Sequence, residues 1–382
     1  DISRVKQRKR KNIKGGERNG FLLPYGGSCN IATISIGRSQ VMPRAQKETE
    51  VGTISGIKNY MYDVDGRKLY DADSTGINVS DFEVPSFYDS PEFHDYHHKF
   101  ADEVVRLGVA SNGGKPIGYC YFGARDGVLR SPYSSPFSLI YLRRNYRTED
   151  ACSFVKGIKD FAVIKGFSGL QLTLPPKIYG NQLINTLEAA LFSEGFRVSS
   201  IELNNYFDLT KYSDLATYLK GCPPKVRKNY RRALRNGLVF EQVDANDVGQ
   251  AYDVIRVNRE QMGYPLKISE NQMRDLVKMD GLVARAFVVK SLERPLAAAI
   301  VFDITDAISQ VIYWGDIVEY RDKRPMDLLT SEIFNVYKKL AKRYLDIGPS
   351  SENGIINLGL ADFKMSIGCN TDTKLVFTYE TE

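Results

Sequence analysis

Residues 313–375 read YWGDIVEYRDKRPMDLLTSEIFNVYKKLAKRYLDIGPSSENGIINLGLADFKMSIGCNTDTKL. A predicted strand ends in Tyr313-Trp314-Gly315 and leads, through a charged turn over 319–324, into a helix with Pro325 in its first turn. Apolar residues recur in that helix at intervals of three and four, which gives it one buried face. A short strand over 344–347, a turn rich in Gly, Ser and Asn over 348–354 and a second short helix follow. This order of elements predicts an α/β unit.

Further elements precede this stretch in the same half of the chain. Helical periodicity predicts helices over 215–219, 225–235, 248–262 and 270–279, and apolar runs predict strands over 283–290, 296–303 and 308–314. In the first half, strands and a hairpin over 103–130 lead to predicted helices over 149–164 and 181–193 and strands over 169–174 and 200–209. Strands that alternate with helices after an antiparallel start are typical of a mixed α/β sheet.

Two segments suggest that the chain contains a repeat. Lys115-Pro116-Ile117-Gly118 and Arg294-Pro295-Leu296-Ala297 each stand at the turn between two predicted strands, 179 residues apart. A spacing of this size indicates a duplicated domain. We therefore expect mixed α/β sheets in two tandem domains, residues 61–210 and 211–382, after an extension over residues 1–60.

The formal net charge of +6 is unevenly distributed along the chain. Residues 1–60 hold twelve Lys and Arg against four Asp and Glu, which leaves 40 against 42 for residues 61–382. The excess therefore belongs to the basic extension, which we expect to be disordered. Such an arm can bind RNA or another anionic surface. Met61 could equally be a natural start, so we build no function on the extension.

Composition places the chain among globular proteins, with 382 residues, 43% hydrophobic and 26% charged. No apolar run approaches the ~20 residues that span a bilayer, and the N-terminus lacks the apolar core of a signal peptide. Five scattered cysteines without a C-x-x-C pair indicate free thiols in a reducing compartment. We expect a cytoplasmic protein without a membrane span.

Two patterns hint at metal sites, and both are incomplete. Residues 71–76 match the beginning of an EF-hand loop, but Phe82 stands where a bidentate glutamate is needed. His94 and His98 would share a helix face, yet no cysteine or H-E-x-x-H glutamate accompanies them. We therefore expect no metal, and we interpret residues 94–98 as the start of a surface helix.

The 313–375 stretch resembles the Fem-type peptidyl and aminoacyl transferases, which are built from two GNAT acyltransferase domains in tandem. The resemblance rests on the aromatic-Gly strand end with its charged turn and long helix, on the Asp-containing strand over 344–348, and on a G-L-x-x-F-K-x-x-[FI]-G block over 359–368. A looser match is the basic helix over 225–236. The resemblance covers most of residues 210–382 and agrees with the repeat.

The resemblance points to Lys364 and Phe363 as the catalytic residues, because they fall on the F-K pair at the Fem-type transfer site. An ammonium held near the acyl carbonyl could stabilise negative charge in the transition state. No G-x-S-x-G elbow occurs, and all three histidines lie before residue 99, so no histidine in the second half could activate a Ser or Cys nucleophile. Direct attack of the acceptor amine on the acyl donor is the consistent mechanism.

The charged turn before Pro325 is the candidate for binding the donor. Tyr320, Arg321, Lys323 and Arg324 precede a helix N-terminus, where free N–H groups favour a phosphate, and they could hold the pyrophosphate of acyl-CoA as co-substrate. The GNAT phosphate loop is Gly-rich, [QR]-x-x-G-x-[GA], and this turn keeps only its Arg. Loss of that loop is common in Fem-type enzymes that use aminoacyl-tRNA.

Two further groups are candidates for binding the acceptor. Arg227, Lys228 and Arg231 lie on the basic helix, and could hold a small-molecule or nucleotide-linked acceptor or the end of a tRNA. A second group, at the end of the helix over 248–262, borders the acceptor pocket in related GNAT proteins: Asn258, Arg259, Gln261 and Tyr264.

We expect an acyltransferase that moves an acetyl or other acyl group from acyl-CoA to an amine of a cell-wall or surface-polysaccharide precursor. The acceptor class follows from the resemblance alone. One alternative is a Fem-type enzyme that uses aminoacyl-tRNA as donor. The others are a nucleic-acid-binding protein that acts through its basic tail and an inactive GNAT-like interaction module.

Overall fold

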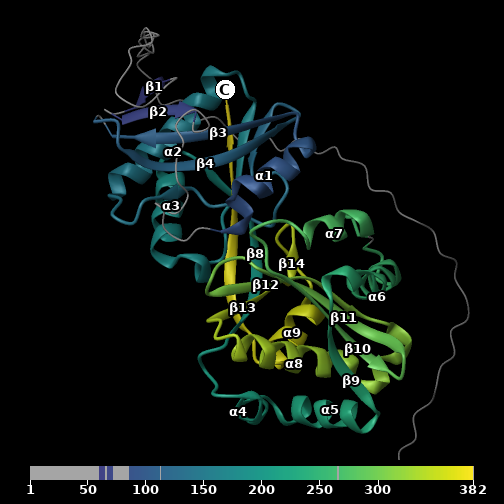
Figure 1. The fold of residues 1–382 in the computed structure, drawn as a ribbon. Coiled ribbons are helices and arrows are strands. Elements are labelled where there is room, and N and C mark those ends of the chain that lie inside the picture. The colour runs from purple at the N-terminus through teal and green to yellow at the C-terminus, as the bar shows by residue number, and fades with distance from the viewer. Residues whose placement is uncertain (1–59, 65–66, 72–85, 112, 265, 382) are drawn as a thin grey trace, which may run out of the picture. The chain divides into compact units, whose positions relative to one another are not determined.

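The structure, a computed structural model, describes residues 60–64, 67–71, 86–111, 113–264 and 266–381, and residues 48–382 form one compact unit (Figure 1). The predicted extension over 1–60 lies outside these ranges apart from Tyr60. The EF-hand-like segment over 71–76 lies outside them apart from Asp71. A 14-stranded mixed sheet runs through both halves of the chain. The mixed α/β class expected from the sequence is confirmed.

The first half builds one end of the sheet. Its described elements are β1 (Tyr60–Val64), β2 (Arg67–Asp71), η3 (Phe87–Asp89), α1 (Pro91–His97), η4 (His98–Phe100), β3 (Glu103–Ala110), β4 (Pro116–Arg125), β5 (Val128–Ser131), β6 (Tyr141–Leu142), α2 (Thr148–Ile164), β7 (Gly169–Thr173), η5 (Lys177–Tyr179), α3 (Asn181–Ser193) and β8 (Arg197–Asp208). Strands β1 to β5 pair antiparallel in order, and β7 then pairs parallel with β5.

The second half repeats this plan from the other end of the sheet. Its elements are α4 (Leu215–Gly221), α5 (Pro224–Arg235), β9 (Leu238–Val243), η6 (Ala245–Asp247), α6 (Val248–Gln261), α7 (Glu270–Leu276), β10 (Ala284–Ser291), β11 (Arg294–Asp303), β12 (Ile308–Asp316), η7 (Val318–Lys323), α8 (Pro325–Lys339), β13 (Tyr344–Pro349), β14 (Ser351–Glu352), β15 (Ile355–Ile356), α9 (Leu358–Ser366) and β16 (Asn370–Glu380). Strands β9 to β12 pair antiparallel, and β13 pairs parallel with β12.

The topology confirms the duplication that the repeat predicted. β4 begins at Pro116 and β11 at Arg294, each antiparallel to the strand before it. In each half a helix, α2 or α8, crosses between two parallel strands. The halves also exchange their last strands, because β16 pairs with β7 of the first half and β8 pairs with β13 of the second. The two exchanged strands pair with each other at the centre of the sheet.

Successive side chains of the central strands in the second half point to opposite faces of the sheet, and each face packs in a separate hydrophobic core. Phe287 and Val289 of β10 pack among residues of α4, α5 and α8, whereas Ala286 and Val288 pack among residues of α6 and α7. Figure 1 shows α6 and α7 on one side of β10 and β11, and α8 with α5 on the other. The core on the α6 side continues into the first half.

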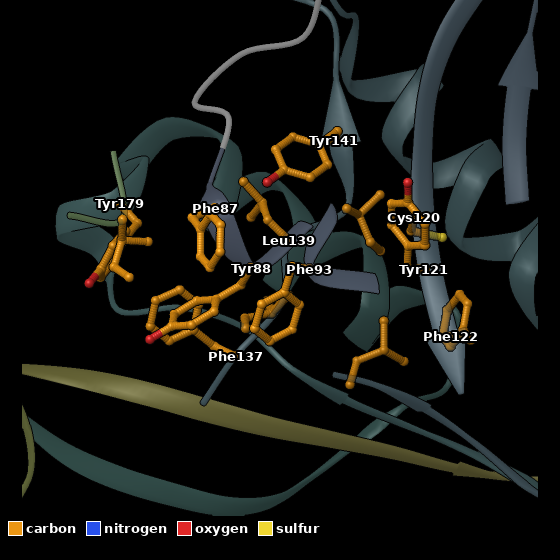
Figure 2. Packing of buried hydrophobic residues seen from close by; sticks show 14 of the residues in the cluster. Phe87, Tyr88, Phe93, Cys120, Tyr121, Phe122, Phe137, Leu139, Tyr141 and Tyr179 are labelled. Atoms are coloured by element: carbon orange, nitrogen blue, oxygen red, sulfur yellow. The ribbon is translucent and has the colours of Figure 1, made fainter. Parts of the chain in front are cut away.

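Aromatic rings fill the first-half part of that core, as Figure 2 shows. The ring of Tyr88 meets those of Phe93 and Phe137 edge to face, with centroids 5.5 and 5.3 Å apart. Such pairs add to the free energy gained by burying the rings themselves. Tyr88 and Phe137 thereby fix the 3-10 helix η3, whose Tyr88 phenol reaches Gln310 in the second half of the chain.

One local interpretation from the sequence is wrong. Helix α1 does begin after Ser90, whose side chain accepts from the Phe93 N–H, but His94 and His97 are buried rather than on the surface. The His94 ring stacks on Tyr121 at 3.5 Å. Within the described residues, no three His, Cys, Asp or Glu side chains are grouped so as to hold a metal. None of the helices in that part of the chain is both long and apolar enough to cross a bilayer.

Candidate active site

The central feature of the second half is the point where β12 and β13 separate. The two strands pair over only three residues, 308–310 with 344–346, although β12 continues to Asp316. Gly348 has a φ of +72°, a conformation that favours glycine, and Pro349 lies opposite Asn204 of β8 instead. The carbonyls of residues 347–349 are not part of the ladder between β12 and β13 and therefore need another partner.

Lys364 supplies that partner. Its Nζ donates to the carbonyl oxygens of Ile347, Gly348 and Pro349, each at 2.9 Å, and the residue is 1% exposed. Burial lowers the pKa of Lys364 to about 8, an effect that Cys369 and Asp346 partly offset. All three ammonium donors are used, so in this structure Lys364 holds the 347–349 turn. Contact with an acyl carbonyl would require one of these bonds to be exchanged.

Aromatic side chains from two elements flank Lys364. The ring of Trp314, on the separated end of β12, lies 6.0 Å from the Lys364 Nζ. Phe363, half-buried on α9, packs against Trp314 with ring centroids 6.3 Å apart. Helix α9 is oriented by Asn357, whose side chain accepts from the Leu360 N–H at 3.0 Å. The predicted pair of Phe363 and Lys364 therefore does lie where the sheet opens, and its catalytic role stays a prediction.

Arg259 is the charged group that remains available beside this opening. It is half-buried at the end of α6, and its guanidinium lies 6.0 Å from the ring of Tyr313 on β12. Among the residues that the structure describes, no carboxylate or other acceptor pairs with it. Its positive charge lowers the pKa of Lys364 and opposes the effect of burial on the pKa of Tyr313, so it lies near both. An unpaired guanidinium can bind a carbonyl, carboxylate or phosphate.

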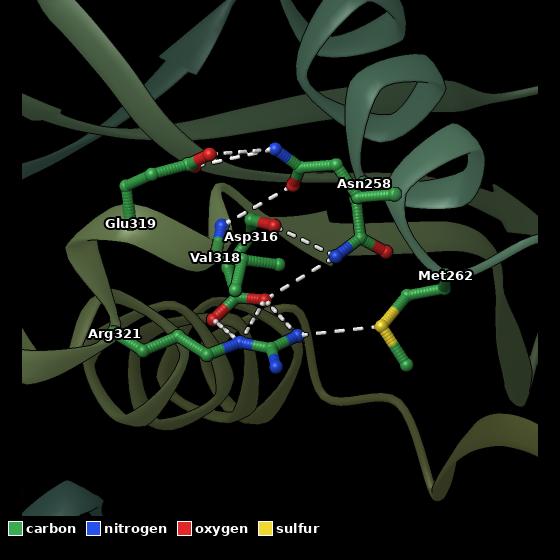
Figure 3. A network of polar contacts seen from close by, with 7 residues as sticks. Asn258, Met262, Asp316, Val318, Glu319 and Arg321 are labelled. Atoms are coloured by element: carbon green, nitrogen blue, oxygen red, sulfur yellow. Dashed lines mark hydrogen bonds and ion pairs between the residues drawn. The ribbon is translucent and has the colours of Figure 1, made fainter. Parts of the chain in front are cut away.

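Asn258 and Gln261, two neighbours of Arg259, form a separate clamp with Asp316 and with two residues of the charged turn, as Figure 3 shows. Asn258 Nδ2 donates to the Asp316 carbonyl at 2.7 Å, and Arg321 Nε and Nη2 donate to the Asp316 carboxylate at 3.0–3.1 Å. Gln261 Nε2 donates to Glu319 at 3.0 Å. These contacts tie the end of α6 to the end of β12 and to η7. Arg321, predicted to bind phosphate, is thus already paired.

The rest of the charged turn is also engaged. The Tyr320 ring lies between the cations of Arg294, 4.7 Å from its centroid, and Lys323, at 5.4 Å. Lys323 Nζ is 3.5 Å from Ser291 Oγ. Arg324 adopts a left-handed conformation with φ +69° at the cap of α8, and its buried Nε has no hydrogen-bond partner among the residues that the structure describes. Of the four predicted residues, Tyr320 carries no charge, and Arg321 and Lys323 already contact Asp316 and Ser291.

The start of α8 already carries a negative charge of its own. Asp327 is the third residue of the helix and accepts from Asn229 Nδ2 of α5 at 3.0 Å. Burial raises the pKa of Asp327, while its contacts with Asn229, Arg324 and Lys225 act against that rise. In the first half, Asp150 is the third residue of α2, where it accepts from the Arg147 N–H at 2.8 Å. A carboxylate therefore stands in the first turn of both helices, where the helix dipole favours a negative charge.

Helix α5 presents the basic surface that the sequence predicted. Val226 and Ala233 are buried against α8, and Tyr230 donates to Glu332 at 2.5 Å. Six cations lie on the remaining faces, half-buried or exposed, and none forms an ion pair within the described part of the chain: Lys225, Arg227, Lys228, Arg231, Arg232 and Arg235. These residues are not part of the opening between β12 and β13.

The structure thus divides the predicted substrate-binding residues among four places. Arg259 lies at the opening, Asn258 and Gln261 belong to the clamp, and Arg227, Lys228 and Arg231 are on α5. Tyr264 is 54% exposed just beyond α6, with its N–H bonded to the Arg259 carbonyl. The sequence reasoning missed Asp327 and Asp150, although their spacing of 177 residues nearly matches that of the Pro116 and Pro295 repeat.

Comparisons with known proteins agree with this fold. No family model and no curated protein matches the chain. FemX is similar in structure, with 14% identity, a TM-score of 0.56 and coverage of 77% of this chain and 92% of that one. The C-terminal domain of a putative lysylphosphatidylglycerol synthetase from Agrobacterium fabrum has 13% identity, a TM-score of 0.51 and coverage of 76% and 87%. L-PGS from Bacillus licheniformis has 15% identity, a TM-score of 0.50 and coverage of 77% and 93%. At these identities the likeness shows the fold, and it confirms the Fem-type, GNAT-like architecture.

Proposed function

We propose that this chain, which has the Fem-type transferase fold, moves an aminoacyl group from an aminoacyl-tRNA to an amine of a cell-wall or surface-polysaccharide precursor. The fold that it shares with FemX and with the two synthetase structures supports acyl or aminoacyl transfer. The acceptor class rests on the Fem-type resemblance of residues 313–375.

The observation that carries the choice of donor is the carboxylate of Asp327 in the first turn of α8. A pyrophosphate of CoA at this helix start would meet a negative charge, and Pro325 has no N–H to offer it. Arg321 is occupied by Asp316. Asp150 creates the same obstacle at α2. Both GNAT-like helix starts thus disfavour a CoA donor.

An RNA donor has a surface available on α5. The six cations of this helix are unpaired within the described residues, and polyanion binding by such a surface releases counterions. The near-neutral charge of residues 61–382 does not oppose this, because binding depends on where the cations cluster. Arg227, Lys228 and Arg231 would hold RNA phosphates, which is one of the roles that the sequence suggested for them.

The chemistry proceeds by direct attack at the opening between β12 and β13. The amine forms a bond to the ester carbonyl carbon, and the ester bond to the tRNA breaks, so the tRNA hydroxyl takes up the proton that the amine loses. Arg259 donates to the carbonyl oxygen as negative charge develops there. Lys364 and Phe363 line the same opening, and Lys364 holds its 347–349 edge.

The experiment supplies the full chain with two labelled donors in parallel. One is total tRNA charged with a ¹⁴C-amino acid mixture, the other is [¹⁴C]acetyl-CoA, and the acceptors are nucleotide-linked cell-wall precursors with a free amine. We expect label to reach the acceptor from tRNA. Transfer from acetyl-CoA alone would replace this donor with acyl-CoA, and transfer from neither would favour an inactive interaction module.

Charge variants separate the α5 surface from the basic extension. Gln at Arg227, Lys228 and Arg231 should weaken tRNA binding, whereas Gln at the exposed first-half cations Lys115, Arg144 and Lys165 should not. A chain without residues 1–47 keeps the compact unit whole and should bind tRNA as before. If binding disappears with the extension instead, the protein acts as a nucleic-acid-binding protein through its tail.

A further inference from the structure

A buried carboxylate lies directly before the 347–349 turn. Asp346 is 0% exposed, and its Oδ2 accepts from Tyr179 Oη at 2.9 Å and from Gln310 Nε2 at 2.8 Å. Its Oδ1 accepts from Asn204 Nδ2 at 2.8 Å and from the Gly348 N–H at 2.9 Å. Both oxygens are therefore fully satisfied, by groups from η5, β12, β8 and β13. A buried charge of this kind is tolerated when its hydrogen bonds are complete.

The network reaches into the first half of the chain at two points. Tyr179 belongs to η5, and Tyr88 of η3 donates to Gln310 Oε1 at 2.5 Å. The ring of Phe137 lies between them, with centroids 5.3 Å from Tyr88 and 4.6 Å from Tyr179. Burial raises the pKa of both phenols well above the usual value, so both remain protonated and act as donors.

The carboxylate and Lys364 hold the same turn from its two sides. Asp346 Oδ1 accepts from the Gly348 N–H, while Lys364 Nζ donates to the Gly348 carbonyl. The left-handed Gly348 is thus fixed at both of its peptide groups. If the carboxylate were removed, the turn would lose its N–H contact, and the position of the Lys364 ammonium would change with it.

We propose that Asp346 is the positioning residue of the transfer site, and that Tyr179 and, through Gln310, Tyr88 make the first half of the chain part of that site. The catalytic consequence rests on the proposed transferase function, whereas the coupling of Asp346 to Lys364 does not. The first half is therefore more than a scaffold, because two of its phenols set the edge of the opening in the second half. A displacement of about 1 Å in a positioning element can reduce a rate by about a hundredfold.

The charges around both groups define a readout of the coupling between Asp346 and Lys364. Lys364 faces Asp346 and Cys369, which raise its pKa, and Arg259, which lowers it, while burial brings the value to about 8. Lys374 of β16 also lies near Asp346: burial lowers the pKa of Lys374, and the negative charges of Asp346 and Glu202 act against that decrease. Removal of the negative charge at Asp346 should therefore lower the pKa of Lys364 further.

The test uses the full chain labelled with [ε-¹³C]lysine, so that the Lys364 signal can be titrated by NMR and assigned with Lys364→Arg. We expect Asp346→Asn to lower the pKa of Lys364 by about one unit, as loss of a nearby opposite charge does. In the tRNA transfer assay, Asp346→Asn and Tyr179→Phe should reduce kcat by about tenfold or more and change KM less than about twofold.

Tyr141→Phe is the matched control. Tyr141 is a buried first-half tyrosine that donates to a buried carboxylate, Asp89 Oδ2, at 2.7 Å, and it is not part of the network. We expect it to leave the pKa of Lys364 unchanged and kcat within about twofold of the wild type. Tyr179→Phe removes only the hydroxyl and keeps the buried ring, so it should fold. It therefore tests the inference even if Asp346→Asn does not fold.

The arms separate failure of this inference from failure of the proposed function. Suppose that Asp346→Asn lowers the pKa of Lys364 but that the wild-type chain transfers nothing from tRNA. This result supports the coupling and contradicts only the proposed function. The inference is overturned if the Lys364 pKa stays the same in Asp346→Asn. If that variant does not fold, a kcat for Tyr179→Phe equal to that of Tyr141→Phe overturns it.

Discussion

Asp150 and Asp327 occupy the same position in the two halves of the chain, as the third residue of the helix that crosses between two parallel strands. Asp150 forms an ion pair with Arg67 at 3.0 Å, and Asp327 accepts from Asn229 at 3.0 Å. The first turn of each of these helices thus contains a carboxylate of the chain itself, where a bound phosphate would otherwise supply the negative charge. This correspondence is the main structural reason for favouring an RNA donor over CoA.

The first prediction follows directly from this correspondence. We expect neither CoA nor acetyl-CoA to raise the Tm of the full chain at millimolar concentration, because Asp327 places a negative charge in the first turn of α8. A ligand present at a hundredfold its Kd would stabilise the protein by about 2.7 kcal/mol, which a thermal shift readily detects. A clear rise with CoA that is lost in an Arg321/Arg324 double alanine variant would contradict this prediction.

The second prediction concerns Arg259. We expect Arg259→Met to lower kcat/KM for aminoacyl transfer by about a hundredfold, because the developing oxyanion loses its charged donor. The free energy of unfolding should change by less than about 0.5 kcal/mol, because Arg259 has no ion pair among the described residues. Urea denaturation checks the second statement. A large loss of stability with unchanged transfer would show that Arg259 supports the fold instead.

Much of this architecture was predictable from the sequence, because it rests on local patterns. The helix over 181–193 has the predicted bounds, and α8 begins at the predicted Pro325. The exchange of β8 and β16 between the halves could not be predicted. Both strands have the same local pattern whichever neighbour they choose, and the choice depends on long-range pairing.

The sequence predicted candidate residues for the site, but it did not predict their hydrogen-bond partners. The resemblance singled out Phe363 and Lys364, yet only the structure shows that they lie at the opening and that three carbonyls use the Lys364 donors. Arg321 and Arg259 are both arginines in polar segments. They differ because Asp316, 5 residues before Arg321 in the sequence, accepts hydrogen bonds from Arg321 and not from Arg259. Sequence spacing alone does not specify such a contact.

The third prediction tests the clamp at the end of β12. A Cβ added to Gly315 would lie 2.6–2.8 Å from the side chain of Asn258, so Gly315→Ala must displace that amide from the Asp316 carbonyl. We expect a loss of about 1–3 kcal/mol in the free energy of unfolding. Combining Gly315→Ala with Asn258→Ala removes the close contacts with Oδ1 and Cγ, at 2.6 and 2.7 Å, and leaves only the one with Cβ at 2.8 Å, so the double variant should lose less than the sum of the single losses. Additive losses, measured by urea denaturation, would argue against the contact.

The fourth prediction concerns pH and Asp89. Burial raises the pKa of Asp89 to about 7, although Ser138 and Tyr141 donate to it. Between pH 4 and pH 7 the folded chain therefore holds a proton that the unfolded chain releases, so this group makes stability fall as pH rises. Asp89→Asn should remove that fall, which amounts to about 2–4 kcal/mol. Urea denaturation at pH 5 and pH 8 checks it, and an equal pH dependence in both proteins would contradict the raised pKa.

The fifth prediction uses salt to count the phosphates held by α5. The logarithm of the affinity for nucleic acid falls linearly with the logarithm of the salt concentration. Each neutralised phosphate contributes about 0.7 to the steepness of this line for a single strand and about 0.9 for a duplex. Gln at Arg227, Lys228 and Arg231 should therefore reduce the slope for tRNA by about 2–3. The Lys115, Arg144 and Lys165 variant has the same net charge and should keep the slope of the wild type. If both variants change the slope equally, the RNA responds to the overall charge of the protein, and the α5 surface has no special part in holding the donor.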